Sequence, residues 1–199
     1  EPMRVLITGG FGYIGGRLAQ YLYQQGCQIV LGSRKMRMVP LWLSGARVVQ
    51  LNWENEEDLR TACNNIDAVV HTAGMSAQDC DNDPVAALEF NGVATARLIR
   101  ASLKSVVSKF IYLSTAHVYC SPLHGNIDET SCPKNLHPYA TSHLSGESSV
   151  LFASQNSDGF AGTVLRLSNV IGKPVSRDVN CWMLLVNDLC RDAVQNRHL

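Results

Sequence analysis

The chain has 199 residues, of which 46% are hydrophobic and 17% charged, enough apolar material for one domain with a buried core. Basic and acidic residues balance, so the net charge of zero gives no electrostatic reason to expect nucleic acid or an anionic membrane as a partner. No apolar run approaches the roughly 20 residues that cross a bilayer.

The chain enters a strand-like run almost at once, which leaves no room for a signal peptide, and Glu1-Pro2 before Met3 is expected to be foreign to the natural start. The seven cysteines are scattered and never form Cys-x-x-Cys, so neither a metal site nor a disulfide framework is predicted. Reduced thiols are typical of cytoplasmic proteins, and we expect a cytoplasmic protein with a single domain over residues 1–199.

Residues 3–8 form an apolar run that stops at glycine, as a buried parallel strand does. Residues 14–25 carry apolar side chains at helical spacing and are followed by Gly26. Further strands are expected at 28–31, 48–51, 67–71, 109–113 and 162–167, and further helices at 56–64, 84–103, 139–154 and 178–196. This alternation predicts an α/β fold, a doubly wound parallel sheet of the Rossmann type. Residues 120–138, with three prolines and Gly125, are expected to form a long loop.

The segment between the first strand and the first helix, residues 8–15, is rich in glycine. Its sequence, Thr-Gly-Gly-Phe-Gly-Tyr-Ile-Gly, satisfies two dinucleotide-binding patterns. Glycines permit a tight turn and close approach of a pyrophosphate, and the helix N-terminus supplies oriented N–H groups. We expect Gly9, Gly12, Tyr13 and Ile14 to bind a dinucleotide; the alternative is a glycine-rich turn without a ligand.

The end of the second strand indicates which dinucleotide binds. An NAD site needs a carboxylate there for the adenosine 2′-hydroxyl, but the run is Gly-Ser-Arg-Lys, with Arg37 close behind. Ser33 can hydrogen-bond a 2′-phosphate, and Arg34 can pair with it and stack on adenine. The sequence therefore predicts NADP, with NAD as the alternative; a merely solvated basic turn is the other interpretation.

Several further motifs follow in a fixed order. They are Val-Val-His-Thr-Ala-Gly at 69–74, Asn-Gly-Val-Ala-Thr at 91–95, Phe-Ile-Tyr-Leu-Ser-Thr-Ala-His-Val-Tyr at 110–119, His-Pro-Tyr at 137–139, Leu-Ser-Gly-Glu at 144–147 and Arg-Leu-Ser-Asn-Val-Ile-Gly at 166–172. With the glycine-rich loop, they make the chain resemble an extended short-chain dehydrogenase/reductase of the NAD-dependent epimerase/dehydratase type. The resemblance implies an oxidoreductase or epimerase acting on a nucleotide sugar or related hydroxyl or keto compound, in a family where dimers through helices 84–103 and 139–154 are common.

The resemblance also implies a catalytic set. Tyr139 would exchange a proton with a substrate hydroxyl or carbonyl, and Thr115 would hydrogen-bond the same oxygen. The family has Tyr-x-x-x-Lys, but this chain has His143 at the lysine position. An imidazole of ordinary pKa near 6.5 is mostly neutral at pH 7.5, so it can still bond a ribose hydroxyl but gives less help to a tyrosinate. We therefore expect activity to be slower or to have a shifted pH profile.

Other roles are implied by position in the resembling family. Tyr139 and His143 would also contact the cofactor. Five residues that follow the third and fourth strands would do the same: Asn52, Trp53, Thr72, Ala73 and Gly74. His117 and Asn169 would face the substrate. His117 as a solvated loop residue and Trp53 as plain core are the alternatives.

The C-terminus departs from the resembling family. Family members are longer and build their substrate pocket largely from a C-terminal portion, which here is missing or minimal because the sequence stops at 198–199 inside a predicted helix. Two other functions stay open: a nucleotide-binding sensor or scaffold with little turnover, and a simple NADPH-dependent carbonyl reductase.

Overall fold

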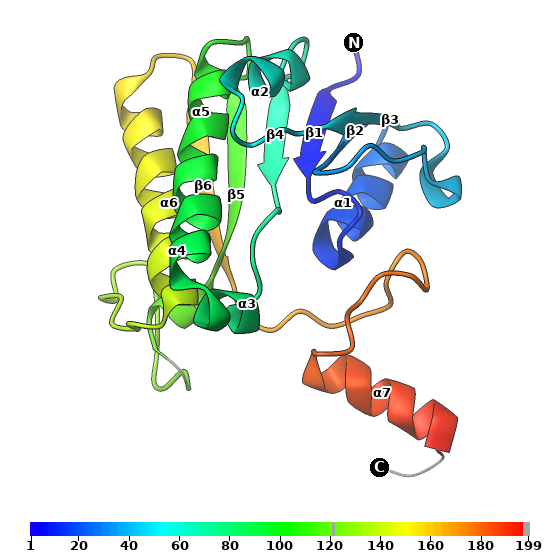
Figure 1. Ribbon diagram of the computed structural model, residues 1–199, viewed down its shortest axis with the longest axis vertical. Coiled ribbons are helices and arrows are strands. Elements are labelled where there is room, and N and C mark those ends of the chain that lie inside the picture. The colour runs from blue at the N-terminus through cyan, green and yellow to red at the C-terminus, as the bar shows by residue number, and fades with distance from the viewer. Residues whose placement is uncertain (121, 197–199) are drawn as a thin grey trace.

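The fold is built on one six-stranded parallel sheet, whose strands are labelled in Figure 1. The computed structural model describes residues 1–120 and 122–196. The strands are β1 (Arg4–Thr8), β2 (Gln28–Ser33), β3 (Arg47–Gln50), β4 (Ala68–His71), β5 (Lys109–Thr115) and β6 (Ala161–Leu167). Their order in the sheet is β3-β2-β1-β4-β5-β6, and every adjacent pair is parallel. This is the doubly wound Rossmann arrangement that the sequence predicted.

Helices cover the two faces of the sheet unequally. The α-helices are α1 (Tyr13–Gln24), α2 (Glu56–Ala62), α3 (Ala77–Asn82), α4 (Pro84–Ala87), α5 (Thr95–Leu103), α6 (Pro138–Asn156) and α7 (Leu185–Asn196). One core cluster joins Leu6, Leu98 and Phe110 between the sheet and α2, α5 and α6. The other joins Ile7, Ala19 and Leu31 beneath α1. Because neighbouring strand residues alternate between the faces, Leu6 and Ile7 belong to different clusters.

The predicted helix 84–103 is continuous but not uniform. Between α4 and α5 the chain forms a π-helical segment, η2 (Leu88–Ala94). Single π turns inside α-helices often mark functional positions. We did not predict α3, although Ser76 caps it and pairs with Asp79 three residues later, which is a recognisable start signal. The short 3₁₀ turns η1 (Leu41–Leu43) and η3 (Ala116–Val118) were also not predicted.

The C-terminal part lies apart from the sheet. Figure 1 shows α7 extending from the molecule at the end of a long connection after β6. The predicted tail helix starts later than expected, at Leu185 instead of 178. The predicted loop 120–138 and the predicted end of the domain at 199 include positions outside the described residues. All seven cysteines are free thiols. No helix in the described ranges has both the length and the apolar character that a bilayer-spanning helix needs.

Candidate active site and cofactor cleft

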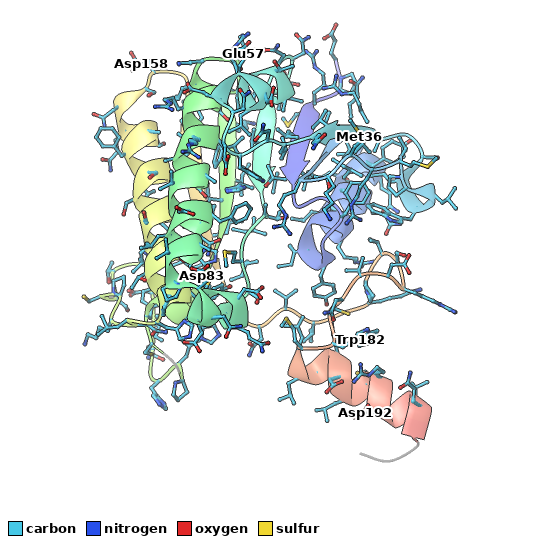
Figure 2. All side chains as sticks on the ribbon, in the orientation of Figure 1. Met36, Glu57, Asp83, Asp158, Trp182 and Asp192 are labelled. Atoms are coloured by element: carbon cyan, nitrogen blue, oxygen red, sulfur yellow. The ribbon has the colours of Figure 1, made fainter. Side chains whose placement is uncertain are left out.

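A cleft of about 1250 Å³ opens at the carboxyl ends of the central strands. Its walls come from the segments that follow β1, β2, β3 and β4, and from α3, α4, η2 and α5. The strand order reverses direction between β1 and β4, so the connections after these two strands diverge and leave a crevice. In Figure 2 the labelled Asp83, which lines the cleft, lies beside α4, and Met36 lies on the far side of β1.

The glycine-rich turn forms the floor of the cleft at the start of α1. Gly9 has φ +64°, a conformation that side chains disfavour, and a Cβ there would lie 2.9 Å from the backbone nitrogen of Ala73. The N–H of Gly12 donates to the carbonyl oxygen of Gly9 at 2.8 Å. Gly12 is also the N-cap of α1, and no side chain caps it. The first N–H groups of this 12-residue helix therefore remain available for a phosphate, which fits a dinucleotide.

Three arginines and three aromatic rings line the cleft, namely Arg34, Arg37, Arg97, Phe11, Trp53 and Phe90. The Arg34 guanidinium lies 6.0 Å from the centre of the Phe90 ring, and Arg37 lies 4.9 Å from the centre of the Phe11 ring. Arg97 donates from Nη1 to the backbone oxygen of Trp53 at 3.2 Å. Arginines beside aromatic rings can pair with a phosphate and stack on adenine. The same cleft is also lined by four acidic residues, Glu54, Asp79, Asp83 and Glu89.

Tyr139 and His143 lie one turn apart on α6, and their rings meet edge to face with centroids 4.6 Å apart. Burial raises the pKa of Tyr139, and a hydrogen bond with the Thr115 side chain partly opposes that rise. Thr115 ends β5, so the sheet and α6 bring the predicted catalytic hydroxyls together. At neutral pH the phenol of Tyr139 therefore keeps its proton, and it is better prepared to donate than to accept one.

His143 is buried and does not carry a positive charge at neutral pH. Burial lowers the pKa of His143 to about 4, although the nearby Glu147 carboxylate acts in the opposite direction. Its Nδ1 lies 2.8 Å from the hydroxyl of Tyr112. A Cβ on Gly74 would lie 3.8 Å from its Nε2, so the other side of the ring faces the wall of the cleft. The ring can bond a ligand hydroxyl there but cannot supply the charge that would lower the pKa of Tyr139.

The model of the NAD-dependent epimerase/dehydratase family matches residues 5–185. The chain belongs to this family. It is similar to UDP-glucose 4-epimerase from Halalkalibacterium halodurans, with 28% identity over 85% of this chain and 52% of that enzyme. It is also similar to human dTDP-D-glucose 4,6-dehydratase, with 27% identity over 85% of this chain and 51% of that enzyme. The chain thus spans about half the length of these curated relatives.

The fold agrees with the same assignment. The structure of UDP-glucose 4-epimerase from Thermus thermophilus in complex with NAD superimposes with a TM-score of 0.76 and 28% identity. That match covers 85% of this chain and 56% of the Thermus chain. The family assignment predicted from the ordered motifs is therefore confirmed.

Most of the predicted cofactor residues of this family member line the cleft. Those that do are Gly9, Gly12, Ser33, Arg34, Trp53, Thr72, Ala73 and Gly74. The other predicted cofactor residues are not among the lining residues: Tyr13, Ile14, Asn52, Tyr139 and His143. The hydroxyl of Tyr13 donates instead to the carbonyl oxygen of Gly172 at 2.7 Å, and the side-chain oxygen of Asn52 accepts from the N–H of Glu54 at 3.3 Å.

The two predicted substrate residues lie outside this cleft. The backbone N–H of His117 donates to the Thr115 hydroxyl at 3.1 Å, and its ring Nδ1 is buried without a partner among the described residues. Asn169 is exposed after β6. His117 is therefore joined to the catalytic set through Thr115, whereas nothing in the described contacts ties Asn169 to it.

Sequence reasoning did not assign roles to Asn91, Phe90 or Arg97. The Asn91 side chain lies in the π-helical segment, accepts from the N–H of Met75 at 3.0 Å and donates to the Ser142 hydroxyl at 3.0 Å. It thereby joins the chain after β4 to α6. Phe90 and Arg97 line the cleft seven residues apart, a helical spacing that could have revealed them. Within the described residues no cluster of histidine, cysteine and acidic side chains could hold a metal ion.

Proposed function

We propose that this chain binds NADP(H) in the cleft and acts as an oxidoreductase or epimerase/dehydratase on a nucleotide sugar or a related hydroxyl or keto compound. The observation that carries the proposal is the cleft itself, which is lined by the uncapped start of α1 and, after β2, by Ser33 and Arg34. The family and the names of the relatives support the substrate class.

The choice of NADP rests on Ser33 and Arg34, supported by Arg37 and Arg97, which line the same cleft. The Thermus relative was solved with NAD, so the two cofactors must be compared directly. In a fluorescence titration we expect NADPH to bind at least about tenfold more tightly than NADH, or about 1.4 kcal/mol.

The variant Arg34→Ala should remove most of this preference. It should weaken the binding of NADPH and leave the affinity for NADH nearly unchanged, because only NADPH carries the 2′-phosphate. Lys35→Ala is the matched control, since Lys35 is adjacent and exposed but does not line the cleft. A preference for NADH would overturn the cofactor proposal and leave the fold untouched. Binding of neither nucleotide would contradict the proposed function as a whole.

In the proposed chemistry Tyr139 passes a proton to or from the substrate oxygen, and Thr115 holds that oxygen in place. The bound cofactor would supply or take up the hydride. His143 would hold a cofactor hydroxyl as a neutral donor. Since the Tyr139 phenol stays protonated at neutral pH, reduction of a carbonyl is favoured over oxidation of an alcohol.

A protonated Tyr139 beside a neutral His143 also favours two alternative functions. They are a simple NADPH-dependent carbonyl reductase and a nucleotide sensor with little turnover. An epimerase returns its hydride to the substrate and can keep its cofactor, whereas a reductase must exchange it. Release of NADP⁺ in each cycle would favour the reductase, and tight binding without turnover of any keto substrate would favour the sensor.

The seven free thiols support the predicted cytoplasmic location.

We propose that the chain forms a homodimer through the face made by α5 and α6. A groove of about 490 Å³ between these helices is lined by Leu103 and Phe152, and Phe152 is 68% exposed. A second copy would cover this apolar surface. Sedimentation equilibrium should show a dimer that Phe152→Asp converts to a monomer, while Val194→Asp on the distant helix α7 leaves it unchanged. A monomeric native protein would contradict the proposal.

A further inference from the structure

Buried polar side chains beneath the cleft form a continuous series of hydrogen bonds from β1 to α6. The Thr8 hydroxyl accepts from the N–H of Ala73 at 3.2 Å and lies 2.6 Å from Nδ1 of His71. On the other side of the ring, Nε2 of His71 lies 2.9 Å from the hydroxyl of Thr95. Thr8 and Thr95 are fully buried and His71 is nearly so, so water does not replace these partners.

The series continues through Tyr112 to His143. Burial raises the pKa of Tyr112, and a hydrogen bond from the Thr95 side chain only partly opposes that rise. Its hydroxyl therefore keeps its proton, and it lies 2.8 Å from Nδ1 of His143. The Tyr112 ring also stacks on His71, with centroids 5.4 Å apart. Each hydroxyl in the series can donate one proton, and each neutral imidazole can donate one and accept one.

The direction of the series is set at its first member. The N–H of Ala73 can only donate, so the Thr8 hydroxyl must accept there. If His71 also donated to Thr8, the Thr8 proton would have no acceptor among the described residues, which is costly for a buried hydroxyl. Thr8 therefore donates to Nδ1 of His71, whose proton resides on Nε2 and is donated to Thr95. The Thr95 side chain is the hydrogen-bond partner that opposes the rise in the pKa of Tyr112, so Thr95 donates to Tyr112. Tyr112 in turn donates to Nδ1 of His143.

We propose that Tyr112 is a positioning residue that fixes His143 in the tautomer with its proton on Nε2, so that the ring presents an N–H donor to the cleft at Gly74. The inference rests on the proposed function for the identity of the acceptor, a hydroxyl of the ribose next to the nicotinamide. It explains how a neutral histidine can hold a hydroxyl at a position where the family has a lysine. No role in the series was assigned to Tyr112, His71 or Thr95 from the sequence.

The tautomer is measured directly by ¹⁵N NMR of the imidazole nitrogens, without cofactor. In the native protein the His143 spectrum should show a protonated Nε2 and an unprotonated Nδ1. Tyr112→Phe removes only the donor hydroxyl and should shift His143 toward a mixture that includes the Nδ1–H form. Tyr139→Phe is the matched control, because its ring touches His143 without bonding Nδ1. A native Nδ1–H form, or an unchanged tautomer in Tyr112→Phe, would overturn the inference. The native spectrum decides the first point even if the variant does not fold.

Binding provides a second readout. Tyr112→Phe should weaken NADPH by about five- to tenfold, the effect of one hydrogen bond. It should leave the affinity for 2′,5′-ADP unchanged, because this ligand lacks the second ribose. An equal loss for both ligands would show a merely structural role and would overturn the inference. If native protein binds neither ligand, the proposed function fails, while the NMR result still decides the tautomer.

Discussion

Tyr139→Phe is expected to lower kcat/KM by about 10²- to 10⁴-fold, because it removes the group that we propose exchanges a proton with the substrate. The change deletes one oxygen and keeps the ring that packs against His143. NADPH affinity should therefore stay close to that of the native protein. Turnover of UDP-glucose in the presence of NADP⁺ can be followed by separating product from substrate, because a hydride that returns to the substrate leaves no net change in nicotinamide absorbance. Tyr21→Phe, on the exposed surface of α1, is the control for a tyrosine outside the site. If Tyr139→Phe kept more than half of the native rate, the proposed proton transfer would be refuted.

The pH dependence of the same reaction tests the role of His143. Oxidation of an alcohol requires a deprotonated Tyr139, burial raises the pKa of Tyr139, and His143 is neutral above a pKa of about 4. The native rate should thus rise steadily toward alkaline pH, without an inflection near 6.5. His143→Lys places a cation one turn from Tyr139, lowers its pKa and should move the rising limb to lower pH. Identical curves for the two proteins would contradict this account.

The strands and the glycine-rich turn could be predicted from local sequence alone. Residues 3–8 and 67–71 are apolar runs closed by glycine or a polar turn, and both lie within one residue of β1 and β4. Local patterns suffice here because buried parallel strands need apolar residues on both faces. The motif order then indicated the family, since several short patterns in one sequence are far more specific than any one of them.

The protonation of His143 could not be predicted in the same way. Its spacing from Tyr139 placed it correctly, and the ordinary pKa of histidine indicated a mostly neutral ring at pH 7.5. The depression of that pKa to about 4 arises from burial, which depends on segments far away in the sequence. Tyr112 lies 31 positions before His143 and becomes its partner only when β5 packs beneath α6. Asn91, in the π-helical turn, likewise finds its partners Met75 and Ser142 in segments that are distant in the sequence.

Glu147→Ala is expected to lower the free energy of unfolding by about 3–5 kcal/mol, because it leaves the Arg166 guanidinium without its carboxylate partner. The Glu147 side chain is only 3% exposed, and Nη2 of Arg166 lies 2.6 Å from its Oε2. Nε of Arg166 adds bonds of 3.0 and 3.1 Å, and the Ser114 hydroxyl donates to Oε1. One carboxylate thus joins α6 to both β5 and β6. Urea denaturation measures the loss.

A second Glu–Arg pair in the same molecule provides the control. Oε1 of Glu57 lies 2.5 Å from Nη2 of Arg60, but the two side chains are 66% and 39% exposed. Figure 2 shows Glu57 at the top of the view, away from Asp83 of the cleft. Water already solvates these charges, so Glu57→Ala should have too small an effect to resolve. Glu147→Gln keeps an acceptor for Ser114, so its loss in the free energy of unfolding should lie between those of Glu147→Ala and Glu57→Ala. If Glu147→Ala cost no more than Glu57→Ala, the carboxylate would not be what holds α6 against β5, and the placement of Tyr139 beside Thr115 would need another cause.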